Sequence, residues 1–230
     1  MVCDLLSSTM KYVSTVLLVV VISLYTKSVI AKTPPPELPC QKYSILGKQH
    51  SLCWTVDDHP NKGTLAMLSV LKKNKIKATF FIVSWALKQY DKYPNNKNTK
   101  KLYGWFKAIQ NDGHLLGNHT VTHSNLCKIS KRQARWELGL TQKYIMKYGK
   151  VRPTLWRPPS LVTCGQAYRA ARRYGLTVVM SDVGDYRRSS AFMWKKLARR
   201  VRRGKTTSII LLHRESKKFQ RFLRLIKQHP

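Results

Sequence analysis

The fold class follows from residues 51–83, which have the sequence SLCWTVDDHPNKGTLAMLSVLKKNKIKATFFIV. Two short apolar runs, 51–56 and 78–83, are rich in β-branched and aromatic residues, a composition typical of buried strands. Between them, residues 64–74 place Leu65, Leu68 and Leu71 on one face of a predicted helix that ends in basic residues. The segment therefore predicts a strand, a helix and a second strand in succession.

The same alternation continues to the C-terminus. Further strands are predicted at 114–117, 155–157, 176–181 and 208–212, and further helices at 102–111, 130–148, 166–174, 191–203 and 217–228. Ser130 is the expected N-cap of its helix. Repeated strand–helix units predict an α/β fold with a parallel sheet, either open or closed into a barrel. In such folds the functional residues stand at the C-terminal ends of the strands.

The N-terminus has the pattern of an export signal. Lys11 precedes an uncharged apolar run at 13–25, and the small residue Ala31 ends the segment that follows. The run is shorter than the roughly 20 residues of a spanning helix. We expect residues 1–31 to be a signal peptide, with an uncleaved anchor as the alternative. Residues 32–50, which contain TPPPELP, predict a proline-rich linker, and 51–230 a single domain.

The charge of the chain is strongly one-sided. Its 43 Lys and Arg against 10 Asp and Glu give a formal net charge of +33, which concentrates a protein on polyanions. With export predicted, we expect anionic envelope polymers as partners and no nucleic acid. Contact with a membrane is expected only if the N-terminal segment stays uncleaved. We expect a monomer that is secreted, periplasmic or associated with the cell wall.

Four cysteines remain after residue 31: Cys40, Cys53, Cys127 and Cys164. An even number in an exported chain favours disulfides, and four cysteines allow three pairings. We favour Cys40 with Cys53 and Cys127 with Cys164, because this pairing joins neighbours in the predicted fold. Their spacing matches no zinc knuckle, so metal binding through sulfur is the weaker interpretation.

Acidic residues are scarce, and their positions are therefore informative. Only nine follow residue 31, and four stand at two predicted strand ends: Asp57, Asp58, Asp182 and Asp185. Two adjacent carboxylates can divide the work, one binding a metal while the other accepts a proton. The alternative is an N-cap in a solvated turn. The scarcity of acids in so basic a chain favours the functional interpretation.

Histidines and an arginine follow other predicted strands. His119 and His123, four residues apart in HTVTH, would share one face of a helical turn and reach one cation. With a carboxylate from another strand end they form a His-His-Asp set with open positions, the layout of a catalytic metal site. Arg157 can hold a carboxylate in place, and His213 is a candidate general acid. Taken singly, the spacing of the two histidines can arise by chance, and Arg157 and His213 would more often be ordinary surface residues.

Together these motifs resemble the polysaccharide deacetylases of the NodB-homology type, carbohydrate esterase family four, over roughly residues 50–228. TVDDH at 55–59 is similar to the family's T-F-D-D-G, and HTVTH at 119–123 matches H-[ST]-x-x-H. RPPS at 157–160 resembles R-x-P-Y, DVGDY at 182–186 resembles D-x-x-D-W, and LLH at 211–213 matches L-x-H. Each motif alone is weak, whereas five in the family's order are highly specific.

The resemblance implies a distorted (β/α) barrel of about seven parallel strands in a single domain. It implies a divalent metal, zinc in the first place and Co²⁺, Ni²⁺ or Mn²⁺ as alternatives, held by Asp58, His119 and His123. By the same carry-over Asp57 is the catalytic base, Arg157 steadies it, and His213 is the acid, oriented by Asp185. The implied substrate pocket is lined by Ser160, Tyr186, Leu211 and His59.

Some residues depart from the family pattern. His59 replaces Gly and adds bulk and a potential further ligand, Ser160 replaces Tyr but keeps a backbone donor, and Tyr186 replaces Trp. Because no implied ligand, base or acid is missing, we expect a hydrolase that removes acetyl groups from a polysaccharide containing N-acetylglucosamine. The charge favours cell-wall peptidoglycan. The alternatives are a deacetylase of chitin-type or O-acetylated polysaccharide, and a non-catalytic cationic envelope protein that binds carbohydrate with the same fold.

Overall fold

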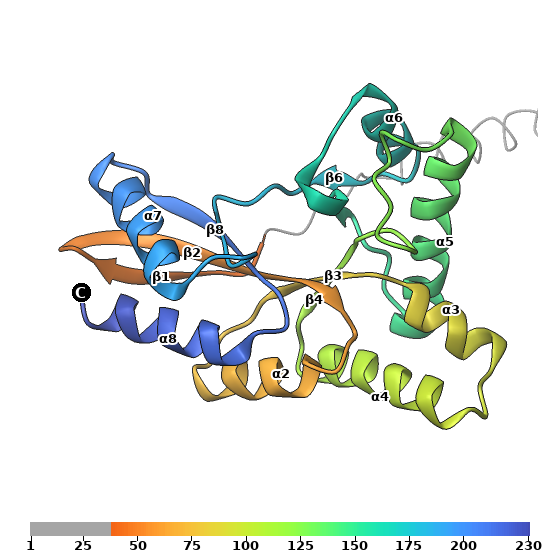
Figure 1. Cartoon of the computed structure of the whole chain (residues 1–230), viewed down its shortest axis with the longest axis horizontal. Coiled ribbons are helices and arrows are strands. Elements are labelled where there is room, and N and C mark those ends of the chain that lie inside the picture. The colour runs from red at the N-terminus through yellow and green to blue at the C-terminus, as the bar shows by residue number, and fades with distance from the viewer. Residues whose placement is uncertain (1–37) are drawn as a thin grey trace, which may run out of the picture. The chain divides into compact units, whose positions relative to one another are not determined.

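The sheet is organised around one long strand, β2 (Lys48–His59), in a computed structural model that describes residues 38–230 (Figure 1). The order of the parallel strands is β6-β5-β4-β3-β2-β8-β7. Strands β6 and β7 are the two edges, so the described residues form an incomplete barrel. The predicted fold of seven parallel strands in one domain is confirmed. The other six strands are β3 (Thr79–Ile82), β4 (Leu115–Asn118), β5 (Leu155–Trp156), β6 (Thr177–Val178), β7 (Val183–Gly184) and β8 (Thr207–Leu212).

Within the described residues, helices follow every parallel strand except β6. They are α2 (Thr64–Lys73), α3 (Trp85–Lys92), α4 (Lys97–Asn111), α5 (Lys131–Gly149), α6 (Gly165–Arg173), α7 (Ser190–Arg202) and α8 (Ser216–Lys227), with a 3₁₀ turn, η1 (Pro159–Leu161). Helix α3 was not predicted from the sequence, and α4 begins five residues before the predicted helix at 102–111. The side chain of Asn96 caps α4 by accepting the N–H groups of Asn98 and Thr99 at 2.9 and 3.3 Å. Among the helices of residues 38–230, none combines the length and apolarity needed to cross a bilayer.

An antiparallel strand precedes the parallel sheet and corrects the predicted linker. Strand β1 (Cys40–Ile45) pairs with the first half of β2 through a tight turn at Leu46 and Gly47, which both have positive φ. Residues 40–50 are therefore a β-hairpin, although TPPPELP had suggested an extended linker up to residue 50. The predicted signal peptide, 1–31, and residues 32–37 lie outside the described residues.

Both favoured disulfides are present in the structure. Cys40 faces Cys53 directly across the hairpin, and the two are bonded. Cys127 and Cys164 are bonded as well, which ties the loop after β4 to the start of α6. The loops that follow β4 and β5 are thus joined covalently near the C-terminal ends of the parallel strands, where the candidate site lies.

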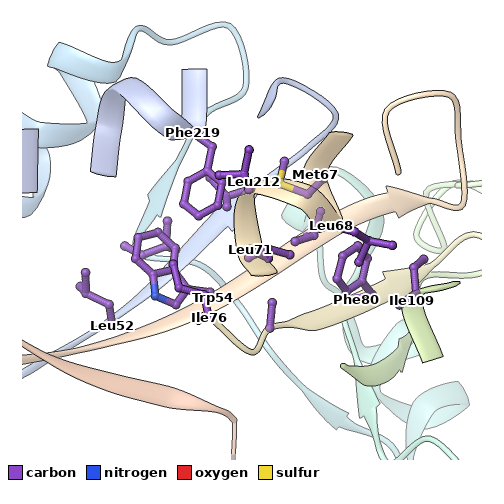
Figure 2. Packing of buried hydrophobic residues seen from close by; sticks show 14 of the residues in the cluster. Leu52, Trp54, Met67, Leu68, Leu71, Ile76, Phe80, Ile109, Leu212 and Phe219 are labelled. Carbon is purple, nitrogen blue, oxygen red and sulfur yellow. The ribbon is translucent and has the colours of Figure 1, made fainter. Parts of the chain in front are cut away.

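The main hydrophobic core packs helices against the central strands (Figure 2). Trp54 of β2 is fully buried, and its ring lies 5.1 Å from that of Phe219 in α8. From α2, Met67, Leu68 and Leu71 enter the core, whereas Leu65, expected on this face, is 55% exposed. Burial of each large apolar side chain stabilises the fold by roughly 1.5–3 kcal/mol. This packing fixes the C-terminal ends of the strands, from which the candidate site is built.

Candidate metal centre and active site

The end of β2 presents two consecutive carboxylates to one cavity. In a regular strand, consecutive side chains point to opposite faces. Here the pairing of β2 with β3 is irregular between Val56 and His59, and Asp58 has a φ of +64°. A bulge of this kind re-aims side chains. As a result Asp57 and Asp58 both line the same cavity at the C-terminal ends of the strands.

The two histidines lie in a loop after β4, and the helical turn expected for HTVTH is wrong. His123 has a φ of +61°, and α5, the next helix, begins only at residue 131. The buried carboxylate of Glu137, on α5, fixes this loop. It accepts the N–H groups of Val121 and Thr122 at 2.7 and 3.0 Å and the hydroxyl of Thr122 at 2.6 Å. These bonds hold the segment between His119 and His123 in one conformation.

Glu137 was not among the residues predicted for the site. One signal was available, because Glu137 is an isolated acid within the basic segment KRQARWELGL. A carboxylate in such a helix either pairs with neighbouring cations or turns inward to backbone N–H groups. The structure has the second arrangement, with the residue only 1% exposed.

Asp58, His119 and His123 direct acceptor atoms at one point. Nδ1 of His119 lies 2.7 Å from the carbonyl oxygen of Arg157, so it carries the proton and leaves a lone pair on Nε2. Burial lowers the pKa of His119, which favours the neutral ring. Its Nε2 lies 3.5 Å from Oδ1 of Asp58, and Nε2 of His123 lies 3.4 Å from the same oxygen.

These three residues fit a divalent cation. Oδ1 of Asp58 is buried and has no hydrogen-bond partner among residues 38–230. The three donor atoms lie within 4.8 Å of one another. Two ligands bound about 2.1 Å from a tetrahedral ion are about 3.4 Å apart, which agrees with the distances to Asp58. Two imidazoles and one carboxylate leave coordination positions open, as catalytic zinc sites do.

The second carboxylate is held by a buried arginine. Nη1 of Arg157 donates to Oδ1 of Asp57 at 2.9 Å and to the hydroxyl of Thr55 at 2.6 Å. The rest of the guanidinium donates to the carbonyls of Val179 and Met180 at 3.0 and 3.1 Å. Arg157 is fully buried, and Asp57 is 2% exposed. With Oδ1 occupied, the other oxygen of Asp57 faces the donor cluster, 3.6 Å from Nε2 of His119.

The imidazole of His213 also lines the cavity. Nδ1 of His213 lies 2.5 Å from Oδ1 of Asp185, whose Oδ2 accepts the backbone N–H of His213 at 3.0 Å. Burial disfavours the charged ring, but the hydrogen bond to Asp185 and the nearby carboxylates outweigh burial and raise the pKa of His213. Its Nε2 remains directed at the cavity, 3.9 Å from Oδ2 of Asp58. A protonated His213 can therefore donate from this atom.

The cavity between these groups measures about 250 Å³. The predicted pocket residues Ser160, Tyr186 and Leu211 line it, together with Pro158 and Leu161, which the sequence analysis did not name. In this loop the N–H groups of Leu161 and Val162 donate the two turn hydrogen bonds. The backbone N–H of Ser160 takes part in neither of them. Tyr186 is 64% exposed and stands at the rim, its ring 5.9 Å from that of His213.

His59 does not line the cavity, contrary to expectation. It is fully buried beneath the bulge, where its Nδ1 lies 2.8 Å from the hydroxyl of Thr64. Burial lowers its pKa to about 4, so the ring is neutral near pH 7. Its ring packs edge-on against Phe80. Strand residues that follow a bulge resume the alternation of faces, and this directs His59 into the core rather than toward Asp58.

Known proteins resemble this chain along most of the described part. The sequence profile of the polysaccharide deacetylase family matches residues 47–179. A peptidoglycan-N-acetylglucosamine deacetylase of Bacillus cereus is 33% identical over 106 residues, which are 46% of this chain and 34% of that protein. A bifunctional xylanase/xylan deacetylase of Cellvibrio japonicus is 28% identical over 161 residues, 69% of this chain and 22% of that protein. The chain thus spans about a third or less of the length of these relatives.

A solved structure agrees in fold. The family 4 carbohydrate esterase from Streptomyces lividans, solved in complex with acetate, superposes with a TM-score of 0.62. The alignment covers 82% of this chain and 88% of that one at 24% identity. The likeness establishes a shared fold.

Proposed function

Because the chain belongs to the polysaccharide deacetylase family, we propose that it is a metal-dependent hydrolase that removes acetyl groups from polysaccharides containing N-acetylglucosamine. Within that class we propose cell-wall peptidoglycan as the substrate. The observation that carries the proposal is one cavity lined by Asp58, His119 and His123, a set that fits a cation, and also by Asp57 and His213.

The hydrolysis needs an attacking water, a stabilised oxyanion and a proton for the departing nitrogen. Asp58, His119 and His123 would hold the cation, for which we propose zinc on the basis of two imidazoles and one carboxylate. A bound divalent cation polarises a carbonyl oxygen and lowers the pKa of water.

Asp57 and His213 would carry the proton transfers. Asp57 accepts the proton of the attacking water on its free oxygen as the water oxygen bonds to the acetyl carbonyl carbon, while Arg157 keeps the other oxygen of Asp57 fixed. The acetyl C–N bond then breaks as Nε2 of His213 gives its proton to the sugar nitrogen, and the products are the free amine and acetate. Asp185 orients the ring throughout.

The remaining walls would position the substrate. The N–H of Ser160 is a candidate donor to the developing oxyanion, and Leu211 offers an apolar contact for the acetyl methyl group. Tyr186, at the rim, can cover the sugar ring.

Peptidoglycan is preferred over neutral polysaccharides because the chain is so basic. A net charge of +33 favours an anionic wall over chitin-type polymers or xylan. We also propose that the protein acts outside the cytoplasm, as a monomer among anionic envelope polymers. Its two disulfides support this location, because such bonds form and persist in oxidising compartments.

Acetate release tests the proposal. The purified protein is incubated with peptidoglycan, chitin oligomers and acetylated xylan, with added zinc or with a chelator. We expect release that needs metal and that is lost in Asp57→Asn. Asp112→Asn serves as the matched control and should stay active, because Asp112 lies at the end of α4, just before the N-terminal end of β4 and away from the C-terminal strand ends that form the site. A folded, metal-loaded protein that releases no acetate from any substrate would refute the proposal and leave a cationic carbohydrate-binding protein.

A further inference from the structure

A second cavity adjoins the candidate active site. It measures about 580 Å³ and lies where α7 and α8 begin. The residues that matter here are Arg214, Glu215, Lys217, Lys218 and Arg221, and we call their site the cationic cavity.

The two cavities are built from the same chain segments. His213 lines the first, and Arg214, the next residue, lines the cationic cavity. Nζ of Lys218 donates to the carbonyl oxygen of Asp185 at 3.1 Å, and the carboxylate of Asp185 holds the ring of His213. The residues of the cationic cavity are therefore neighbours of the groups that hold His213 in place.

The cationic cavity has an unbalanced charge. Its single acid, Glu215, is paired with Lys218 at 2.8 Å. Within residues 38–230, Arg214, Lys217 and Arg221 form no ion pair, and all three are exposed. Lys217 and Arg221 are four residues apart on α8, so they project from one face of the helix. Like charges gathered without counter-charges repel one another, and an anion that binds between them relieves this repulsion.

From these observations we propose that the cationic cavity binds a carboxylate carried by the polysaccharide that is being deacetylated. The inference rests on the proposed function and specifies which group of the substrate the cationic cavity recognises. Guanidinium groups suit a carboxylate because they can donate two parallel hydrogen bonds to it. A carboxylate covalently linked to the substrate is favoured over a separate polyanion because Arg214 directly follows His213 in the chain and Lys218 donates to the backbone of Asp185.

The test compares two forms of one substrate. N-acetylglucosamine oligomers that carry a carboxylate on alternate sugars are assayed beside the same oligomers with each carboxylate converted to an amide. The measured quantity is the ratio of kcat/KM for the acidic form to kcat/KM for the amidated form. In the double variant Lys217→Gln/Arg221→Gln we expect this ratio to fall about tenfold, since two charge-assisted contacts to the carboxylate are lost.

A matched control removes the same charges elsewhere. Lys73 and Arg224 line a different cavity between α2 and α8. Both lie near the C-terminal ends of their helices, and therefore away from the C-terminal strand ends that form the active site. Lys73→Gln/Arg224→Gln should leave the ratio unchanged. A ratio equally altered in both double variants would mean that general charge acts, and this would overturn the inference.

Two further outcomes are distinct. Acetate release from both oligomers with a ratio that Lys217→Gln/Arg221→Gln does not change overturns this inference and leaves the proposed function intact. That result, combined with weaker binding of a phosphate polymer by the same variant, would assign the cavity to a separate polyanion. Failure of the wild-type protein to release acetate from any substrate would instead contradict the proposed function.

Discussion

Replacing Arg157 by Met tests whether its buried pair with Asp57 holds the site together. The substitution keeps an apolar side chain of similar length but removes the guanidinium. Asp57, 2% exposed, then loses a partner at 2.9 Å, and the carbonyls of Val179 and Met180 lose theirs. Breaking a buried ion pair by deleting one partner costs about 3–5 kcal/mol, because the remaining charge is buried without compensation. We expect Arg157→Met to lower the free energy of unfolding by that amount.

The assay is urea unfolding followed by tryptophan fluorescence, with a chelator present so that metal binding does not contribute. Asp57→Asn is measured alone and together with Arg157→Met. Since Asn removes the uncompensated charge, adding Asp57→Asn to Arg157→Met should restore roughly 1–3 kcal/mol. The exposed Arg172→Met should change stability by no more than about 0.5 kcal/mol. A loss below about 1 kcal/mol in Arg157→Met, or no recovery in the double variant, would refute the reasoning.

Three other results are expected. Glu137→Gln should weaken Co²⁺ binding about 10- to 100-fold, because an amide cannot accept all three hydrogen bonds from the loop that carries the histidines. The visible absorption of bound Co²⁺ measures this affinity. Asp91→Asn, the control, should leave Co²⁺ affinity unchanged. Burial lowers the pKa of His114 to about 4, so between about pH 6.5 and 4 the unfolded chain binds a proton that the folded chain does not. The free energy of unfolding therefore decreases by up to about 3 kcal/mol as the pH is lowered from about 6.5 to 4. The difference in unfolding free energy between wild type and His114→Gln should change by the same amount over this window. A difference that stays constant with pH would contradict the assignment. Gly117→Ala should cost about 1–3 kcal/mol, measured by urea unfolding, because a Cβ there would lie 2.6 Å from the ring of Phe81, whereas Gly104→Ala, in an open helical position, should stabilise by up to about 1 kcal/mol.

The general layout of the site was predictable because strand ends in a parallel sheet converge. Asp57 and Asp58 follow one apolar run, and His213 follows another directly. Once these runs are assigned as parallel strands, their C-terminal residues must lie on the same side of the sheet, at the ends of the strands. The structure places them there, around one cavity. The roles of the individual side chains in catalysis remain proposals.

What the sequence did not reveal depends on backbone conformation. The pattern HTVTH has a helical spacing, yet its conformation is set by Glu137 on a separate helix, 14 residues after His123. The direction of His59 depends on a bulge in which Asp58 has positive φ, a conformation that local propensity does not favour for aspartate in a strand. The predicted strand at 176–181 shortens to β6 because the chain leaves that edge and crosses to β7, beside β8 at the opposite edge. In each case a long-range contact overrides a local signal.

The position of the acids explains how so basic a chain can hold a cation. Asp57, Asp58, Asp185 and Glu137 are four of only nine acids after residue 31, and all four belong to this site. Two unit charges 4 Å apart near a protein surface attract with about 4 kcal/mol, whereas exposed cations beyond the Debye length of about 8 Å are largely screened. Under the proposed function, the carboxylates in the cavity would therefore determine whether a metal binds, and the exposed cations would determine which polymer approaches. It follows that Lys217→Gln/Arg221→Gln should alter the preference for acidic substrates without changing Co²⁺ affinity, while Asp58→Asn should abolish Co²⁺ binding in a protein that is still strongly basic.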